Sequence, residues 1–361
     1  MAQWAAFVNR FVQQLGSESL LAIARKPPCS NSNSAEFMTI RVGLVGTGYA
    51  AGARAKAFRA DPRSQLLSVA GHHFESAATF AESHDLKVME GWQQLVADDS
   101  LDLVVVATVS SLHGEVVEAA LTAGKHVVVE YPLSLDLAQA ERLVKLAAER
   151  NLLLHVEHIE LLGGLHRAVQ AHLPKVGTPS YVSYCTLNPQ HPAPMKWTYR
   201  SDLFGFPFCG ALSRVHRLTN LFGPVEAVTC CTQTTDSQAD PTYFASILSS
   251  ARLQFQSGVV AELTYGKGEN LWVYRREIEV QGSSGALVFN RDEGKLTTAE
   301  GTAPIAVTPR RGLFVKDTEG VLDYLSEGKP LYVSAAESVY ALSVGDALRR
   351  ASANGKTVTL G

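Results

Sequence analysis

The chain has 361 residues, of which 46% are hydrophobic and 19% are charged, and its formal net charge is −3. This length suffices for two ordinary domains, and the apolar content excludes a wholly disordered chain. The small net charge gives no reason to expect a nucleic-acid partner, and no apolar run reaches the ~18 residues that would predict a membrane span. Five cysteines without a C-x-x-C pair indicate reduced thiols in a cytoplasmic protein.

Residues 1–38 form an N-terminal extension that differs in character from the rest of the chain. Residues 26–36 read KPPCSNSNSAE, which is typical of a linker, and no secretory signal pattern is present. We expect either a disordered tail or a false start, with translation beginning at Met38. A transit peptide is a less well supported alternative.

From residue 40, short β-branched runs alternate with segments of helical periodicity. We expect strands at 40–45, 66–70, 103–107, 126–130 and 152–156, and helices to about residue 59 and over 134–150, the latter with Ser134 as its N-cap. The runs LVVVA and HVVVE suit strands buried on both faces. This alternation predicts an α/β domain over residues 39–160, with the doubly wound parallel sheet of the Rossmann type.

The pattern changes after about residue 175. Alternating strands are expected at 179–187, 225–233, 248–256, 259–266, 272–280 and 286–289, and helices near 211–221, 315–327 and 335–353. We therefore predict a C-terminal α+β domain over residues 161–361, built on a largely antiparallel sheet, that binds the substrate.

A glycine-rich turn follows the first expected strand. It reads Gly46-Thr47-Gly48-Tyr49-Ala50-Ala51, a G-x-G-x-x-A motif that opens a helix. The first glycine permits the tight turn, and the second lets the backbone approach a pyrophosphate at the helix N-terminus. Residues 46–50 are thus predicted to bind a dinucleotide.

The end of the second strand bears on which dinucleotide binds. Enzymes that use NAD usually place an acid there, but this chain has His72 and His73, and the first carboxylate is Glu75. Imidazoles can donate hydrogen bonds to a 2′-phosphate. We therefore expect NADPH as the cofactor, with NADH weaker, although the two histidines could equally be exposed loop residues.

Two longer motifs carry a family resemblance. GLVGTGYAA at 43–51 and VVVATVSSLHGEVVEAALTAGKHVVVEYP at 104–132, together with the two-domain layout, resemble the glucose–fructose oxidoreductase/inositol dehydrogenase family. In that family a loop after the fourth strand lies over the cofactor, and a Glu-Lys-Pro, often with a cis peptide bond, ends the fifth strand. The resemblance implies that Thr108, His113, Glu130 and Tyr131 contact the cofactor.

The chain departs from this family at two positions. Tyr131 stands where the Glu-Lys-Pro motif has lysine, and His216 has Leu212 four residues before it instead of aspartate. The family's sugar dehydrogenases need that lysine and an Asp-x-x-x-His pair to take the alcohol proton. Ordinary sugar dehydrogenation is therefore disfavoured.

A narrower resemblance fits these departures. The segments EYP at 130–132, HVEHIELLGG at 155–164, KWTY at 196–199, FGFP at 204–207 and ALSR at 211–214 are similar to the biliverdin reductases of that family, the cyanobacterial ones above all. This implies an enzyme that reduces biliverdin to bilirubin with NADPH, by hydride transfer to the central methine carbon of the tetrapyrrole.

Such a reaction needs cations for two propionates and a source of a proton. The resemblance implies that Arg214 is closest to catalysis, where it would position a propionate or a water, and Arg217 shares its helix face. A salt bridge is the alternative role for both arginines. Tyr131 would bear on a flat π-system, unless it is a packing residue. Either Glu157 or Glu160 could supply a proton if burial raised its pKa, or could belong to a network that holds the nicotinamide loop.

Further basic residues could meet the propionates, and among them we expect Lys196, Arg275 and Arg311 to bind substrate. Arg275 and Arg276 point to opposite faces of a strand, so at most one of them faces the ligand. No metal site is predicted, and the protein is expected to be a monomer or a homodimer. Alternatives are an NADP-dependent oxidoreductase of the family acting on a sugar or small unsaturated substrate, and a non-catalytic dinucleotide sensor.

Overall fold

The computed structural model describes residues 39–360, which form two compact units. The N-terminal unit comprises residues 39–159 and 312–339, and the C-terminal unit comprises residues 160–311 and 340–360. Sequence analysis predicts one boundary at residue 160, whereas in the structure the segment 312–339 returns to the N-terminal unit. The expectations for residues 1–38 lie outside the described residues.

A six-stranded parallel sheet forms the centre of the N-terminal unit. Its strands are β1 (Ile40–Val45), β2 (Ser64–Ala70), β3 (Lys87–Val88), β4 (Leu103–Val106), β5 (His126–Val129) and β6 (Leu154–Val156). They lie in the order β3-β2-β1-β4-β5-β6, which is the strand order of a doubly wound dinucleotide-binding fold. The predicted Rossmann-type sheet is confirmed.

The helices of this unit include one that is distant in the sequence. Those between the strands are α3 (Tyr49–Ala60), α4 (Phe74–His84), α5 (Trp92–Val96), α6 (Ser110–Thr122) and α7 (Leu137–Glu149), and the sixth is α12 (Leu313–Glu327). Val321, Leu322 and Leu325 of α12 enter the same buried cluster as Ala55 and Phe58 of α3. Burial of these apolar side chains therefore holds α12 beside α3, against the parallel sheet.

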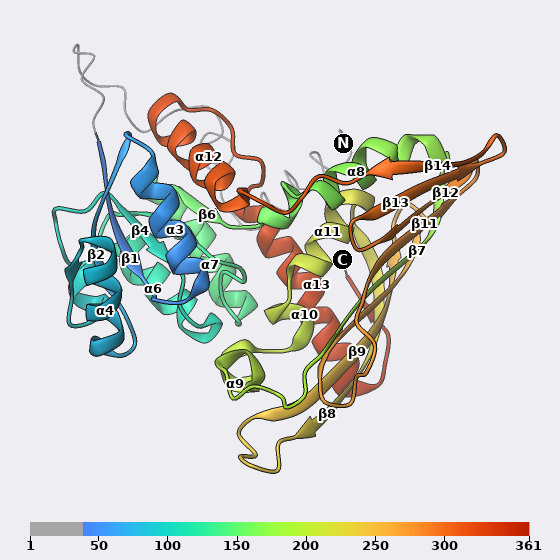
Figure 1. Cartoon of the computed structure of the whole chain (residues 1–361), viewed down its shortest axis with the longest axis horizontal. Coiled ribbons are helices and arrows are strands. Elements are labelled where there is room, and N and C mark those ends of the chain that lie inside the picture. Colours follow the sequence, from blue (N-terminus) through green and yellow to red (C-terminus); the bar gives the residue numbers. More distant parts are fainter. Residues whose placement is uncertain (1–38, 361) are drawn as a thin grey trace. The chain divides into compact units, whose positions relative to one another are not determined.

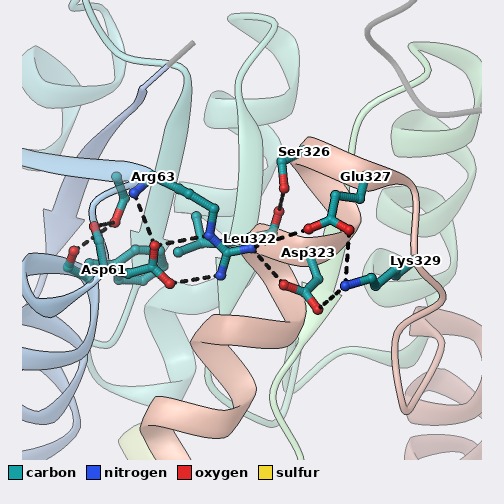
Figure 2. A network of polar contacts seen from close by, with 9 residues as sticks. Asp61, Arg63, Leu322, Asp323, Ser326, Glu327 and Lys329 are labelled. Carbon is teal, nitrogen blue, oxygen red and sulfur yellow. Dashed lines mark hydrogen bonds and ion pairs between the residues drawn. The ribbon is translucent and has the colours of Figure 1, made fainter. Parts of the chain in front are cut away.

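A polar network also anchors α12 (Figure 2). Arg63, at the turn before β2, forms ion pairs with Asp61 at 2.7 Å and with Asp323 of α12 at 2.6 Å. Lys329 pairs with Asp323 at 3.1 Å and with Glu327 at 3.0 Å. These contacts fix the end of α12 against the loop between α3 and β2.

The start of α7 differs from the prediction. Asp136 is the N-cap, and its carboxylate accepts a hydrogen bond from the backbone N–H of Gln139 at 3.0 Å. Ser134 instead accepts from the backbone N–H of Asp136 at 3.0 Å and donates to the Gln139 side chain at 2.6 Å. Both residue types cap helices well, so the choice between them depends on the path of the preceding chain.

The C-terminal unit contains a nine-stranded sheet. Its strands are β7 (Pro179–Pro189), β8 (Val225–Asp236), β9 (Phe244–Phe255), β10 (Val260–Gly268), β11 (Arg275–Gly282), β12 (Gly285–Asn290), β13 (Glu293–Thr298), β14 (Gly301–Ala306) and β15 (Val358–Thr359). The order is β14-β13-β12-β11-β7-β10-β9-β8-β15, and only β7 and β10 pair in parallel. The predicted largely antiparallel sheet is confirmed.

Helices cover one face of this sheet (Figure 1). They are α8 (Gly164–His172), α9 (Ser201–Phe204), α10 (Pro207–Gly210), α11 (Ser213–Phe222) and α13 (Ala335–Asn354), accompanied by the short helices η1 (Ile159–Leu161), η2 (Leu173–Val176) and η3 (Trp197–Tyr199). Within the described residues, no helix is long and apolar enough to cross a membrane.

Candidate active site

The glycine turn between β1 and α3 is shaped for a dinucleotide phosphate. Gly46 has φ +126°, and a Cβ there would lie 2.2 Å from the carbonyl oxygen of Ala107, so only glycine fits. Gly48 is the N-cap of α3, and no side chain caps that end. A Cβ on Gly48 would meet no atom within 4 Å, so the space beside the turn is open. The free N–H groups of α3 can therefore receive a pyrophosphate.

The predicted neighbours in this turn lie beside it. The γ-methyl of Thr47 lies 3.1 Å from the position of a Cβ on Gly71, where β2 ends. Tyr49 is 87% exposed and contacts the ring of Phe314 edge-on at 6.2 Å, and Ala50 is half-buried. The backbone of residues 46–50 therefore lies at the open side of the turn.

Two exposed imidazoles follow the end of β2. His72 and His73 have their ring centroids 4.5 Å apart, and Glu75 is exposed in the first turn of α4. Both rings can donate hydrogen bonds outward, as a 2′-phosphate requires.

His113 is buried, and its contacts are with the backbone. Its Nδ1 lies 2.7 Å from the carbonyl oxygen of Pro132, and its Nε2 lies 3.2 Å from that of Thr108. Burial lowers the pKa of His113, so the ring is neutral and has one N–H to donate. His113 thus joins the loop after β4 to the cis Tyr131–Pro132 bond that follows β5, and both are segments that the resemblance assigns to the cofactor.

Tyr131 is fixed by a parallel stack. Its ring lies 5.3 Å from that of His158, at an interplanar angle of 8°. His158 is buried, with its Nε2 2.8 Å from the Oγ of Ser338 and its backbone N–H donating to the hydroxyl of Tyr332 at 3.0 Å. Contacts from the returning segment 312–339 therefore orient Tyr131.

A buried carboxyl group with a raised pKa directly follows β6. Glu157 is 1% exposed; burial and the adjacent Glu130 carboxylate raise the pKa of Glu157 well above its usual range. In its protonated form, which this shift favours, Glu157 donates to Glu130, and it accepts from the backbone N–H of Ile159 at 2.5 Å. Glu130 in turn accepts from the Nε of Arg54 at 3.0 Å.

The sequence did not predict the buried ion pair between Arg54 and Asp317, which lies next to Glu130. Arg54 of α3 and Asp317 of α12 are both fully buried and hydrogen-bonded. Asp317 also accepts from His155 at 2.8 Å and from the hydroxyl of Tyr332 at 2.7 Å. An arginine in an alanine-rich helix gives no sequence signal of burial, since arginine is usually exposed.

In the C-terminal unit, arginines gather around one glutamate. Glu160 accepts from Arg217 at 2.9 Å, forms an ion pair with Arg310, and lies 3.9 Å from Arg276. Burial alone would raise the pKa of Glu160, but these three guanidinium groups and that of Arg214 outweigh it and lower the pKa. Glu160 is therefore ionised at neutral pH and does not fit the predicted role of proton source. We call this set of four arginines and Glu160 the arginine cluster.

Arg214 and Arg217 extend from α11 toward the sheet. The Nε of Arg214 lies 3.4 Å from the Oγ1 of Thr186 on β7, and its guanidinium lies 4.9 Å from the ring centroid of Tyr265 on β10. Arg217 is 1% exposed and donates to the hydroxyl of Tyr184 at 2.6 Å. As predicted, the two arginines share a helix face, and they carry more positive charge than Glu160 offsets.

The other predicted substrate residues are placed differently. Arg275 pairs with Glu277 on its own strand at 2.5 Å and is exposed, whereas its neighbour Arg276 belongs to the arginine cluster. Arg310 is likewise in the cluster, and Arg311 and Lys196 are exposed. The structure thus brings in Arg276 and Arg310 in place of Arg275 and Arg311.

His216 is the residue that the resemblance places opposite the catalytic histidine of the family's sugar dehydrogenases. It is fully buried in α11, and burial together with His166 lowers the pKa of His216 to about 3. A base this weak takes a proton from an alcohol poorly at neutral pH. Among the described residues, no group of histidine, cysteine and acidic side chains is arranged to hold a metal ion.

Comparison with known proteins identifies both domains. Residues 40–158 match the NAD-binding Rossmann fold of an oxidoreductase family, and residues 174–360 match the C-terminal alpha/beta domain of the same family. A crystal structure of biliverdin reductase from Synechocystis sp. PCC 6803, in complex with biliverdin and NADP+, is 48% identical with a TM-score of 0.85, covering 87% of this chain and 99% of that one.

Two further relatives are named for substrates that differ from each other. The dTDP-3,4-didehydro-2,6-dideoxy-alpha-D-glucose 3-reductase of Actinomadura kijaniata is 32% identical over 278 residues, covering 72% of this chain and 77% of the relative. Human biliverdin reductase A is 30% identical over 193 residues, covering 52% of this chain and 60% of the relative. The chain therefore belongs to the glucose–fructose oxidoreductase/inositol dehydrogenase family of nicotinamide-dependent oxidoreductases, and it is similar to the biliverdin reductases within that family.

Proposed function

We propose that the protein reduces biliverdin to bilirubin with NADPH. The observation that carries this proposal is the arginine cluster, in which three arginines pair with one carboxylate and the charge of a fourth, Arg214, also acts on it. The surplus charge suits a substrate with two propionates, because guanidinium groups bind carboxylates in a defined geometry. The 48% identity with a biliverdin reductase that binds biliverdin and NADP+ supports the same substrate.

The cofactor would be held by the N-terminal unit. The open N-terminus of α3 beyond Gly48 would receive the pyrophosphate, and His72 and His73 would bond the 2′-phosphate, where an acidic residue would repel it. When bound, NADPH supplies the hydride that is added to the central methine carbon.

The proton that completes the reduction is added at a pyrrole nitrogen. Arginine loses its proton too reluctantly to be a simple acid, so Arg214 would hold a propionate or a water through which the proton passes. Tyr131, with an unperturbed pKa of ~10, would act through its ring, which bears against the flat tetrapyrrole or nicotinamide. Glu157 would position the Tyr131 loop through its hydrogen bonds to Glu130 and Ile159.

A second candidate function is reduction of a nucleotide-linked keto sugar, which the Actinomadura kijaniata relative favours. Reduction at a sugar carbonyl needs a nearby group that delivers a proton to the alkoxide. Tyr131 replaces the family's lysine, and His216, with its pKa lowered by burial to about 3, is a neutral ring at physiological pH. Reduction of a bilin requires neither that lysine nor a catalytic histidine.

The test is a side-by-side substrate assay. Purified protein with NADPH should remove the long-wavelength absorbance of biliverdin and produce the bilirubin band, under mildly acidic or neutral conditions. A dTDP-linked 3-keto sugar with NADPH, and a polyol panel with NADP+, should give no turnover. Keto-sugar turnover without bilirubin formation would replace the proposal with the second candidate. NADPH binding without any turnover would indicate a non-catalytic sensor.

A further inference from the structure

A second buried cation lies near Arg214 in the C-terminal unit. Lys267 is on β10 and is 6% exposed. Its ammonium donates to the carbonyl of Thr198 and lies 3.8 Å from the ring centroid of Phe204 and 4.7 Å from that of Tyr199. The ring of Phe244 lies at 5.2 Å. Lysine is almost never fully buried unless it is paired, and the groups around this one are a carbonyl and three aromatic rings.

The geometry of β10 explains why the charge of Arg214 affects the pKa of Lys267. Tyr265 precedes Lys267 by two positions on β10, so both side chains lie on the same face, about 6.6 Å apart along the strand. The guanidinium of Arg214 lies over the Tyr265 ring, at 4.9 Å from its centroid. Both positive charges thus lie on the side of β10 to which the buried side chains of Tyr265 and Lys267 point. Burial and, after it, the charge of Arg214 lower the pKa of Lys267 to about 7.

The other groups that face Lys267 do not change charge near neutral pH. From η3, Tyr199 has a pKa that burial raises to about 12. From β10 itself, burial raises the pKa of Tyr265. Arg214 of α11 keeps its charge at all relevant pH values, and Phe204 of α9 and Phe244 of β9 have none. Lys267 is therefore the group in this neighbourhood that titrates near pH 7.

We propose that Lys267 is a positioning residue that takes up a proton when a carboxylate binds at Arg214, and that its charge then strengthens the binding of that carboxylate. This rests on the proposed function, in which the carboxylate is a propionate of the bilin. The bound anion offsets the repulsion from Arg214, so the protonated form of Lys267 becomes less costly. Because such coupling is reciprocal, protonated Lys267 must favour binding of the anion to the same extent.

The direction of the pH effect follows from this coupling. Binding raises the pKa of Lys267 above its value of about 7 in the free protein. Substrate affinity is therefore highest below that pH, where Lys267 is already protonated, and it falls as the pH rises through about 7. The rise in pH therefore increases KM for biliverdin and leaves kcat unchanged, because Lys267 does not touch the reacting atoms.

The coupling can be measured without any substrate. In protein labelled with ¹³C at the lysine Cε, the Lys267 signal is identified by its absence from Lys267→Arg. Its titration midpoint should lie near 7 in the wild type. It should be higher by about one pH unit in Arg214→Gln, because a neighbouring like charge is removed. An unchanged midpoint in Arg214→Gln would overturn the proposal.

The second measurement is biliverdin binding to the protein loaded with NADP+, which cannot donate a hydride. Wild-type Kd should be about tenfold weaker at about pH 8.5 than at about pH 6, whereas Lys267→Met should bind equally at both. Lys295→Met, an exposed lysine on β13, should keep the wild-type dependence. If Lys267→Met does not fold, Lys267→Arg gives the same test, because its permanent charge should make binding independent of pH.

The outcomes separate this inference from the proposed function. Retention of the wild-type pH dependence in Lys267→Met or Lys267→Arg overturns the role of Lys267, even if biliverdin is turned over. Failure of biliverdin to bind at either pH, with the effect of Arg214→Gln on the Lys267 midpoint intact, overturns the proposed substrate and leaves the coupling between the two cations standing.

Discussion

Arg54 and Asp317 are 263 positions apart in the sequence and form a fully buried ion pair. Burial alone would lower the pKa of Arg54 and raise that of Asp317. Their mutual attraction, with Glu130 assisting Arg54 and His155 assisting Asp317, outweighs burial and shifts both pKa values the opposite way. Both groups are therefore charged at neutral pH. The pair connects α3, which begins at the glycine turn, to the segment that orients Tyr131.

Loss of the Asp317 charge should destabilise the N-terminal unit strongly. Asp317→Asn leaves Arg54 buried with only Glu130 as a charged partner, and removal of one partner of a buried pair costs about 3 to 5 kcal/mol. Asp323→Asn, a partly exposed partner of Arg63, should cost less than about 1 kcal/mol. Urea unfolding of the two variants measures this difference. Equal effects would show that the buried pair contributes no more than a surface one.

Glu157→Gln distinguishes positioning from proton donation. Glutamine keeps both hydrogen-bonding functions of the protonated acid, so kcat should stay within about threefold of the wild type. A general acid contributes about 100-fold or more, so a loss of that size would make Glu157 the proton donor.

The same variant has a pH signature in stability. The pKa of Glu157 is raised on folding, so the stability that its protonated form contributes is present below its unfolded pKa of ~4.3 and is lost as the pH rises through the folded pKa. Unfolding free energies measured upward from about pH 4 should decline more steeply in the wild type than in Glu157→Gln, until the pH passes the folded pKa. Parallel curves would mean that the proton is not held more tightly in the folded state.

Tyr131 should act through its ring. Tyr131→Phe keeps the parallel stack on His158 and removes only a hydroxyl that is a poor acid, so kcat/KM for biliverdin should change by less than about threefold. Tyr131→Ala removes the stacking surface and should lower kcat/KM about tenfold or more. If the phenylalanine variant is as impaired as the alanine variant, the hydroxyl takes part in proton transfer.

The end of β2 should select the cofactor. His72→Asp places a negative charge where the 2′-phosphate would bind, so Kd for NADPH should rise about tenfold or more relative to Kd for NADH. Fluorescence titration of both cofactors with wild type and variant measures this ratio. An equal change for both would mean that His72 and His73 are exposed loop residues with no part in cofactor choice.

The N-terminal fold could be predicted because its signals are local. Buried parallel strands such as 103–106 read as unbroken β-branched runs, and the glycine turn between β1 and α3 has a fixed composition. Strands β13 and β14 were missed because EGKLTT and GTAPIA contain glycine, proline and few buried positions. The return of α12 to the N-terminal unit depends on long-range packing against α3, for which neither segment has a sequence marker.

In the candidate site, too, the local patterns could be predicted from the sequence and the long-range contacts could not. Strand alternation predicts that only one of Arg275 and Arg276 faces the helices, but the choice depends on the register of β11 against β7, which pairs Arg276 with Thr186. Two glutamates three positions apart, Glu157 and Glu160, have pKa values shifted in opposite directions, because one lies beside a carboxylate and the other beside arginines. Residue types alone do not reveal such surroundings.

The decisive experiment compares the rate of biliverdin reduction by NADPH in wild type and Arg214→Ala, with Kd for NADPH measured in parallel. Wild type should form bilirubin. Arg214→Ala should lose about 10- to 100-fold in kcat/KM, as expected for loss of a hydrogen bond to a charged group, with Kd for NADPH unchanged. Arg349→Ala, at the surface of α13, should match wild type. Absence of bilirubin formation by the wild type would overturn the proposed function, and full activity in Arg214→Ala would overturn the role of the arginine cluster in substrate binding.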